Sequence, residues 1–217
     1  MPSYSQIELN RYNVAFKSMD GTAIKDPLFG GFNSPQFSSI DLNRDGIKDL
    51  FVFDRIGEKV KTFINQGGNG INYTYAPEYE SIFPNLYSFA ILRDFNQDGI
   101  EDIFTSSINR GPVGSGMLVM EGFIEEGNLQ FRRFQHQPWT ANVISVPSIN
   151  GQRTNMEIPF TDIPAVDDID GDGDLDVVVA LENDHTVAWV ENIGGLFDST
   201  NIQKIDDHED SYAVYAV

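Results

Sequence analysis

The sequence predicts an all-β protein built from repeated units of about four short strands. Three segments share the pattern D-x-[DN]-x-D-G-x-x-D, at residues 41–49, 94–102 and 168–176, and a short apolar stretch lies on each side of every copy. No stretch shows the 3.6-residue apolar period of an amphipathic helix. About four strands in roughly 50 residues is the size of one blade, so the expected fold is a β-propeller of four-stranded blades.

The strands are predicted from their apolar patterns and from the turns between them. Apolar stretches precede the three acidic loops at 37–40, 89–92 and 163–166, and others follow the loops at 50–53, 103–104 and 177–181. Alternating apolar residues at 60–64 and 71–75 predict half-buried strands, and the continuously apolar 187–190 predicts a strand buried on both faces. Turn signals fall at 66–70, 126–128 and 192–195.

The loop spacing divides the chain into an N-terminal segment, 1–34, and a repeat array, 35–217. Residues 1–34 are expected to supply strands around 7–16 and 22–28, as a partial blade or closing segment, and 211–217 resembles another pre-loop strand. The longer second interval is expected to hold an irregular loop at about 138–162, where Pro and Asn-Gly turn signals occur. Propellers begin at four blades, so the array is expected to be a partial arc of about three to four blades from a larger propeller. Further blades of the same parent chain, or a second copy, would complete the ring.

Oxygen-bearing side chains at alternate loop positions predict calcium sites. Positions 1, 3 and 5 converge on one point, the Gly at position 6 permits a sharp bend, position 7 offers its carbonyl, and position 9 closes the shell. An all-oxygen, flexible set of six or seven ligands suits Ca²⁺ better than Mg²⁺. Up to three structural ions are expected, with the third loop binding tightest because it has the most carboxylates. The predicted ligands are Asp41, Asn43, Asp45, Ile47, Asp49, Asp94, Asn96, Asp98, Ile100, Asp102, Asp168, Asp170, Asp172, Asp174 and Asp176.

Two other interpretations of the loops lead to different structures. An EF-hand needs a bidentate Glu at position 12, where these loops have Val52, Thr105 and Val179 inside apolar β runs. The second is an Asx-rich turn that needs no ion, which three matched copies disfavour. Each loop joins two strands and lies near no obvious reactive group, so the expected role of bound calcium is structural.

The composition argues against several classes of partner. The chain has 14 Lys and Arg against 33 Asp and Glu, a formal charge of −19, which disfavours nucleic acid and anionic lipid. It has no Cys, which excludes disulfides and thiolate metal sites. No apolar run exceeds six residues, so no membrane insertion is expected. The start lacks a signal peptide, which fits a cytosolic protein or a secreted one whose signal has been removed.

No group of residues predicts catalysis, and the chain is expected not to be an enzyme. Twelve of the 33 acids lie in the three loops, where ligated carboxylates cannot act as free acids or bases. His136, His185 and His208 are scattered along the chain. The segment 131–134 with Trp139 offers an aromatic and basic patch for a sugar or peptide, although an ordinary strand face is the simpler interpretation.

The loop pattern, with Trp189-Val-Glu-Asn192 followed by Gly194-Gly195, resembles the FG-GAP and VCBS repeat families, whose propellers include those of integrin α-subunits. The resemblance extends from about residue 32 to the end, and segments 30–37 and 49–55 are similar to secreted surface proteins of gliding, polymer-degrading bacteria. It implies structural calcium in the loops, with Asn43 and Asn96 as conservative variants. It also implies a secreted or cell-surface protein that serves adhesion or binds an extracellular protein or carbohydrate. The alternative is an accessory propeller part of a secreted polysaccharide lyase or hydrolase.

Overall fold

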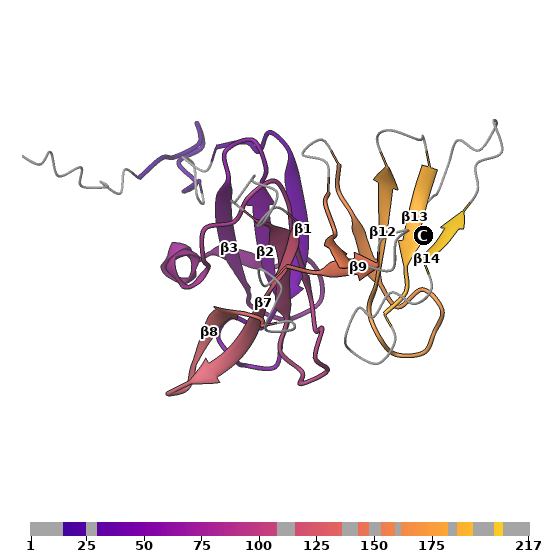
Figure 1. Ribbon diagram of the computed structural model, residues 1–217. Helices are drawn as coiled ribbons and strands as arrows, with labels where there is room; N and C mark the ends of the chain where they lie inside the picture. The colour runs from indigo at the N-terminus through magenta and orange to yellow at the C-terminus, as the bar shows by residue number, and fades with distance from the viewer. Residues whose placement is uncertain are drawn as a thin grey trace, which may run out of the picture. The chain divides into compact units, whose positions relative to one another are not determined.

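The computed structural model describes residues 15–24, 30–107, 116–135, 143–147, 153–158, 162–181, 186–192 and 202–205, in two units, Met1–Gly31 and Phe32–Val217 (Figure 1). In the first unit the described residues form a tight turn. Lys17 pairs with Ala23, and the backbone N–H of Gly21 donates to the Ser18 carbonyl at 2.9 Å. Most of the strands predicted at 7–16 and 22–28, and all of the strand predicted at 211–217, lie outside the described residues.

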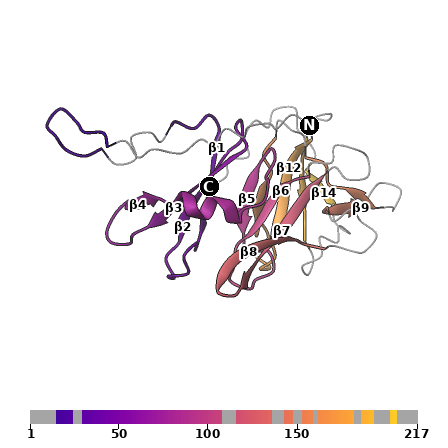
Figure 2. The ribbon, with the colours of Figure 1, turned by 90° about the vertical axis from the view of Figure 1, so that its left-hand side faces the viewer.

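The described residues of the second unit form three four-stranded antiparallel sheets, each with its strands in sequence order, which confirms the all-β class and the four-stranded repeat. Sheet 1 consists of β1 (Pro35–Ile40), β2 (Asp49–Asp54), β3 (Lys59–Asn65) and β4 (Tyr73–Tyr75). Sheet 2 consists of β5 (Ala90–Arg93), β6 (Asp102–Ser106), β7 (Met117–Glu125) and β8 (Asn128–Arg133), drawn side by side in Figure 2. Sheet 3 consists of β11 (Ala165–Asp167), β12 (Asp176–Leu181), β13 (Thr186–Val190) and β14 (Ile202–Ile205).

The described residues of the segment predicted as an irregular loop at 138–162 include two strands, so that prediction is wrong there. The segment contains a two-stranded sheet of β9 (Ser145–Pro147) and β10 (Arg153–Asn155). The reason is a short ladder beside β7, in which the Ile144 N–H donates to the Met117 carbonyl at 2.7 Å and the Met156 N–H donates to the Ile144 carbonyl at 2.8 Å. Ile144 is fully buried, and its apolar contacts hold the segment against sheet 2.

Two smaller differences occur around β4. The strand predicted at 71–75 begins only at Tyr73, and Ile71 is 94% exposed. A 3₁₀ helix, η1 (Pro77–Ile82), follows β4, with Pro77 at a first-turn position where its missing N–H costs nothing. A 3₁₀ helix of six residues, about two turns, is too short to produce an apolar period in the sequence.

The described apolar side chains form two cores, one on each face of sheet 2. The residues of β6 alternate between them: Ile103 packs with Phe51 and Phe53 of sheet 1, and Phe104 packs with Val177 and others from sheet 3. Both β6 side chains are fully buried. A strand that is buried on both faces needs apolar residues at consecutive positions. This explains why apolar and polar residues do not alternate at Ile103 and Phe104 of β6.

The first strands of the sheets also contact one another: β1 contacts β5, and β5 contacts β11. Side chains of β1 bond to the backbone of β5, since the Ala90 N–H donates to Gln36 Oε1 at 2.9 Å and the Leu92 N–H donates to Ser38 Oγ at 3.2 Å. Arg55, just after β2, donates to the Ser88 carbonyl at 2.6 Å and to the Asp162 carbonyl at 3.3 Å. These bonds tie sheet 1 to the segments that lead into β5 and β11.

Candidate metal centre

Each acidic loop joins the first and second strands of a sheet. The first loop (41–49) connects β1 to β2, the second (94–102) connects β5 to β6, and the third (168–176) connects β11 to β12. All fifteen predicted ligand residues lie in the described part of the chain. The flanking elements are strands in every case, so the rejection of an EF-hand, which needs helices, is confirmed.

The three loops share one backbone conformation. Position 6 is left-handed in each, with φ of 84° at Gly46, 88° at Gly99 and 98° at Gly173. Position 4 is left-handed as well, although two of its three residues, Arg44 (φ 62°) and Gln97 (φ 60°), are not glycine. A non-glycine residue in this region costs about 1 kcal/mol, so a repeated occurrence indicates that the coiled path of the loop is held by its other contacts.

Those contacts come from the aspartates at positions 1 and 5. In the first loop, Asp41 accepts the N–H groups of Asp45 at 3.1 Å and Gly46 at 2.9 Å, and Asp45 accepts that of Ile47 at 2.8 Å. The second loop repeats all three bonds within 0.1 Å, through Asp94 and Asp98. In the third loop Asp168 instead accepts Gly171 at 2.8 Å and Gly173 at 3.1 Å. The side chains therefore turn inward and hold the loop closed.

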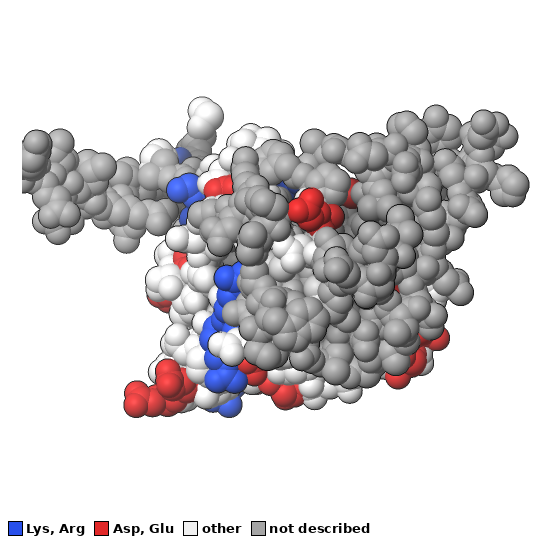
Figure 3. Space-filling view, in the orientation of Figure 1, with Lys and Arg blue, Asp and Glu red and all other residues white. Residues whose placement is uncertain are grey.

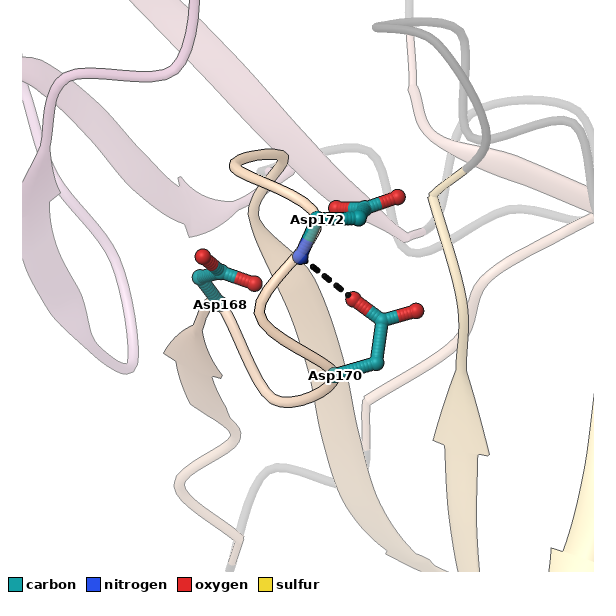
Figure 4. A group of neighbouring side chains, drawn as sticks. All are labelled: Asp168, Asp170 and Asp172. Carbon is teal, nitrogen blue, oxygen red and sulfur yellow. Dashed lines mark hydrogen bonds between the residues drawn. The ribbon is translucent and has the colours of Figure 1, made fainter.

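Position 3 distinguishes the third loop from the other two. Asn43 donates a hydrogen bond from its side-chain amide to Asp45 at 2.9 Å, and Asn96 donates one to Asp98 at 3.0 Å, so each amide stabilises the neighbouring carboxylate without adding a negative charge. The third loop has Asp170 there, and one carboxylate oxygen each of Asp168, Asp170 and Asp172 lies within 4.8 Å of the others (Figure 4). The three carboxylates are exposed, and a single cation can bridge them.

The aspartate at position 9 has different surroundings from the other loop aspartates, because it is fully buried in all three loops. One oxygen accepts the N–H of position 2: Leu42 donates to Asp49 at 2.8 Å, Phe95 to Asp102 at 2.8 Å and Ile169 to Asp176 at 3.2 Å. The other oxygen accepts an N–H from the third strand or its end, from Asn65, Gly122 and Asn192 at 2.8, 2.7 and 2.8 Å. Position 9 thus joins the loop to the hairpin beside it.

Gly122 shows how closely that hairpin approaches the second loop. A Cβ added to Gly122 would lie 2.4 Å from the carbonyl oxygen of Glu101, closer than any real contact. Only glycine lets β7 come near enough for its N–H to reach Asp102. The sequence gives a weak signal for this contact, since Gly122 is an isolated glycine inside an apolar strand.

Burial and mutual charge affect the acidity of these groups. Desolvation raises the pKa of Asp102 to about 6, against the lowering effect of the backbone donors Gly122, Phe95 and Asn96, and it also raises the pKa of Asp49. At Asp170 the N–H of Asp172 lowers the pKa, but partial desolvation and the other carboxylates of the loop raise it by more. A bound cation favours the ionised form of each carboxylate.

Neighbouring loops are in contact. Lys48 of the first loop forms an ion pair with Glu101 of the second, and Gln97 of the second donates to the third. A cavity of about 400 Å³ lies between the first two loops, with Arg44, Asp98 and Glu101 among its polar lining and Ile124 and Leu129 of sheet 2 among its apolar lining. The sequence alone did not predict this cavity, because its walls come from two repeats.

Figure 3 shows one face of the molecule, on which the described Lys and Arg side chains form a narrow column and the described acids lie in small separate groups. The segment 131–134, considered as an aromatic and basic patch but more simply interpreted as a strand face, lies in β8 up to Arg133: Arg132 pairs with Glu121 at 2.7 Å across β7 and β8 and lies over the Phe123 ring, and Trp139 is outside the described residues. No helix among the described residues is long and apolar enough to span a membrane.

Comparison of the chain with family models, with curated proteins and with solved structures finds no match.

Proposed function

We propose that the chain is a calcium-stabilised β-propeller module, secreted or at the cell surface, that serves adhesion or binds an extracellular protein or carbohydrate and has no catalytic activity of its own. The observation that supports it best is the shared loop geometry. Three loops place oxygen-bearing side chains at positions 1, 3 and 5 on the same coiled backbone, and three carboxylates of the third gather within 4.8 Å.

The donor set suits a hard cation. Positions 1, 3, 5 and 9 supply carboxylate or amide oxygens in every loop, and a carboxylate that accepts two N–H groups still has lone pairs available. Asn43 and Asn96 would each use the side-chain oxygen. A bound Ca²⁺ would neutralise carboxylates that otherwise repel one another. Exposed loops of this type fit the 10⁻⁴–10⁻³ M affinities typical of extracellular modules.

The propeller arrangement is supported by the order of the sheets. Three four-stranded sheets follow one another in sequence, their first strands are in contact, and apolar cores lie between consecutive sheets. These are the relations between neighbouring blades. Because a ring needs at least about four blades, we propose an arc of three to four blades, completed by further blades of the parent chain or by a second copy.

Calcium binding is tested by thermal unfolding with and without the ion. At a free calcium concentration about 100 times the dissociation constant, one site adds about 2.7 kcal/mol to the free energy of unfolding, which raises the melting temperature by about 5–10 °C for a chain of this size. Asp172→Ala should lower the melting temperature by several degrees more in calcium than in EDTA, where it removes only the exposed bond from the Asp174 N–H. Asp167→Ala is the matched control, because it removes a carboxylate next to the loop and outside its ligand positions. Equal destabilisation of Asp172→Ala in both buffers would contradict the proposal.

The binding role is tested separately on glycan and extracellular-protein arrays, together with an assay for polysaccharide cleavage. Calcium-dependent binding without cleavage supports the module. Cleavage that survives mutation of all loop ligands and is lost on mutation of an acid outside the loops would favour the accessory propeller of a polysaccharide lyase or hydrolase instead.

A further inference from the structure

The side chain of Gln97 connects the second loop to the third. Its amide nitrogen Nε2 donates to the Gly173 carbonyl at 2.8 Å and to the Asp174 carboxylate at 3.2 Å. Both acceptors belong to the third loop, at positions 6 and 7. The two acceptors identify the atom facing them as the amide nitrogen, since the amide oxygen there would meet two oxygens.

This contact is particular to one of the three loops. Arg44 occupies the same position in the first loop with nearly the same φ, but it donates to the Gly127 carbonyl, in the turn between β7 and β8, at 3.4 Å. Position 4 of the third loop is Gly171, which has no side chain. Arg44 is therefore a natural control for Gln97, equal in position and conformation but directed at a turn.

The backbone of Gln97 is part of the coiled second loop. It lies between Asn96 and Asp98, whose side chains bond to each other at 3.0 Å, and its φ of 60° is set by the coil of the second loop. On the other side, Gly173 and Asp174 are held by Asp168 at 3.1 Å and by Asp172 at 2.8 Å. Asn96 and Asp98, two proposed ligands of the second loop, are the sequence neighbours of Gln97. Asp168 and Asp172, two proposed ligands of the third loop, accept the N–H groups of the two residues to which Gln97 donates.

We infer that Gln97 is a positioning residue, which holds the third loop in its coiled form and couples the second and third loops so that an ion in one strengthens binding in the other. The coupling rests on the proposed calcium function, whereas the positioning does not. When one loop is ordered, the bonded partner loses less conformational freedom on binding its own ion, and the effect is reciprocal by linkage. Hydrogen bonds of this strength predict a coupling of about fivefold in affinity.

Amide hydrogen exchange in EDTA tests the positioning role without metal. Gln97→Ala should raise exchange in the peptide that covers 168–176 by about threefold or more, and Arg44→Ala should leave that peptide unchanged. Unchanged exchange in Gln97→Ala, or an equal rise in both variants, would overturn the inference.

Calorimetric calcium titration tests the coupling. It uses an Asp45→Ala background, which removes calcium binding at the first loop. With Gln97 present, Asp172→Ala in the third loop should weaken binding at the second loop by about fivefold, and with Gln97→Ala the same change should weaken it by less than about twofold. The same loss in both backgrounds would overturn the coupling. A protein that binds no calcium would defeat the proposed function and the coupling, while the exchange experiment would still decide whether Gln97 positions the loop.

Discussion

Replacing the buried Asp102 by alanine should destabilise the metal-free protein, and the loss should be greater in acid than at neutral pH. The side chain is fully buried and accepts the N–H groups of Phe95 at 2.8 Å and Gly122 at 2.7 Å. Asp102→Ala leaves both donors buried without an acceptor, and each such donor costs about 1–3 kcal/mol. The loss measured below pH 5 should therefore be about 4 kcal/mol.

The pH dependence follows from the acidity of the same group. Burial raises the pKa of Asp102 from its ordinary value of 3.8 to about 6. A group whose pKa is higher in the folded state binds more protons there, so its contribution to stability is full below about pH 4 and is lost as the pH rises through 6. One pH unit corresponds to about 1.4 kcal/mol, so the contribution of Asp102 to the free energy of unfolding should fall by about 2 kcal/mol between pH 4.5 and 7.5. Alanine does not titrate, so the cost of the substitution should fall by that amount.

Urea denaturation in EDTA at pH 4.5 and 7.5, on the wild type and Asp102→Ala, measures the difference. Val119→Ala is the control, because it removes a fully buried side chain from the same sheet without a titrating group. A cost that is the same at both pH values, or larger at pH 7.5 in EDTA, would refute the account. Repeating the pH 7.5 measurement in calcium should increase the cost again if Asp102 binds the ion, because a cation favours the ionised carboxylate.

The remaining predictions concern two glycines and one arginine, all measured by urea denaturation in EDTA. Gly122→Ala should cost more than about 3 kcal/mol, because its Cβ would lie 2.4 Å from the backbone oxygen of Glu101. Gly46→Ala should cost only about 1 kcal/mol, since the space around it is open and only the φ of 84° opposes the substitution; equal losses for the two would contradict the steric argument. Arg55→Ala should cost about 2 kcal/mol through the loss of charge-assisted bonds such as that to the Ser88 carbonyl, and an unchanged urea midpoint would show that these bonds are not needed.

Local patterns in the sequence predicted most of the strands. The alternation of Val60, Thr62 and Ile64 corresponds to β3, and the apolar residues after each acidic loop correspond to β2, β6 and β12. The short ladder that orders β9 and β10 was missed, because it depends on hydrogen bonds between Met117, Ile144 and Met156. These residues are far apart along the chain, and no local period reports such contacts.

The loops show the same division between local and distant information. Their acidic pattern and the bend at position 6 were evident in the sequence, because those features depend on neighbouring residues. The burial of Asp49, Asp102 and Asp176 was not, because their second partners lie 16 to 20 residues further along the chain. Gln97 and its acceptor Gly173 in the third loop are 76 residues apart along the chain. Glutamine is common on protein surfaces, so its presence in the sequence does not predict such a contact.

The two-sided burial of sheet 2 also limits how the chain can be shortened. Ile103 packs toward sheet 1 and Phe104 packs toward sheet 3. Removing either outer sheet would therefore expose a large aromatic or aliphatic surface to solvent. A fragment ending after Arg133 would keep every strand of sheet 2, but the face of that sheet that packs against sheet 3 would be an exposed apolar surface, which favours aggregation. Removing either outer sheet should therefore lower the solubility of the fragment that remains.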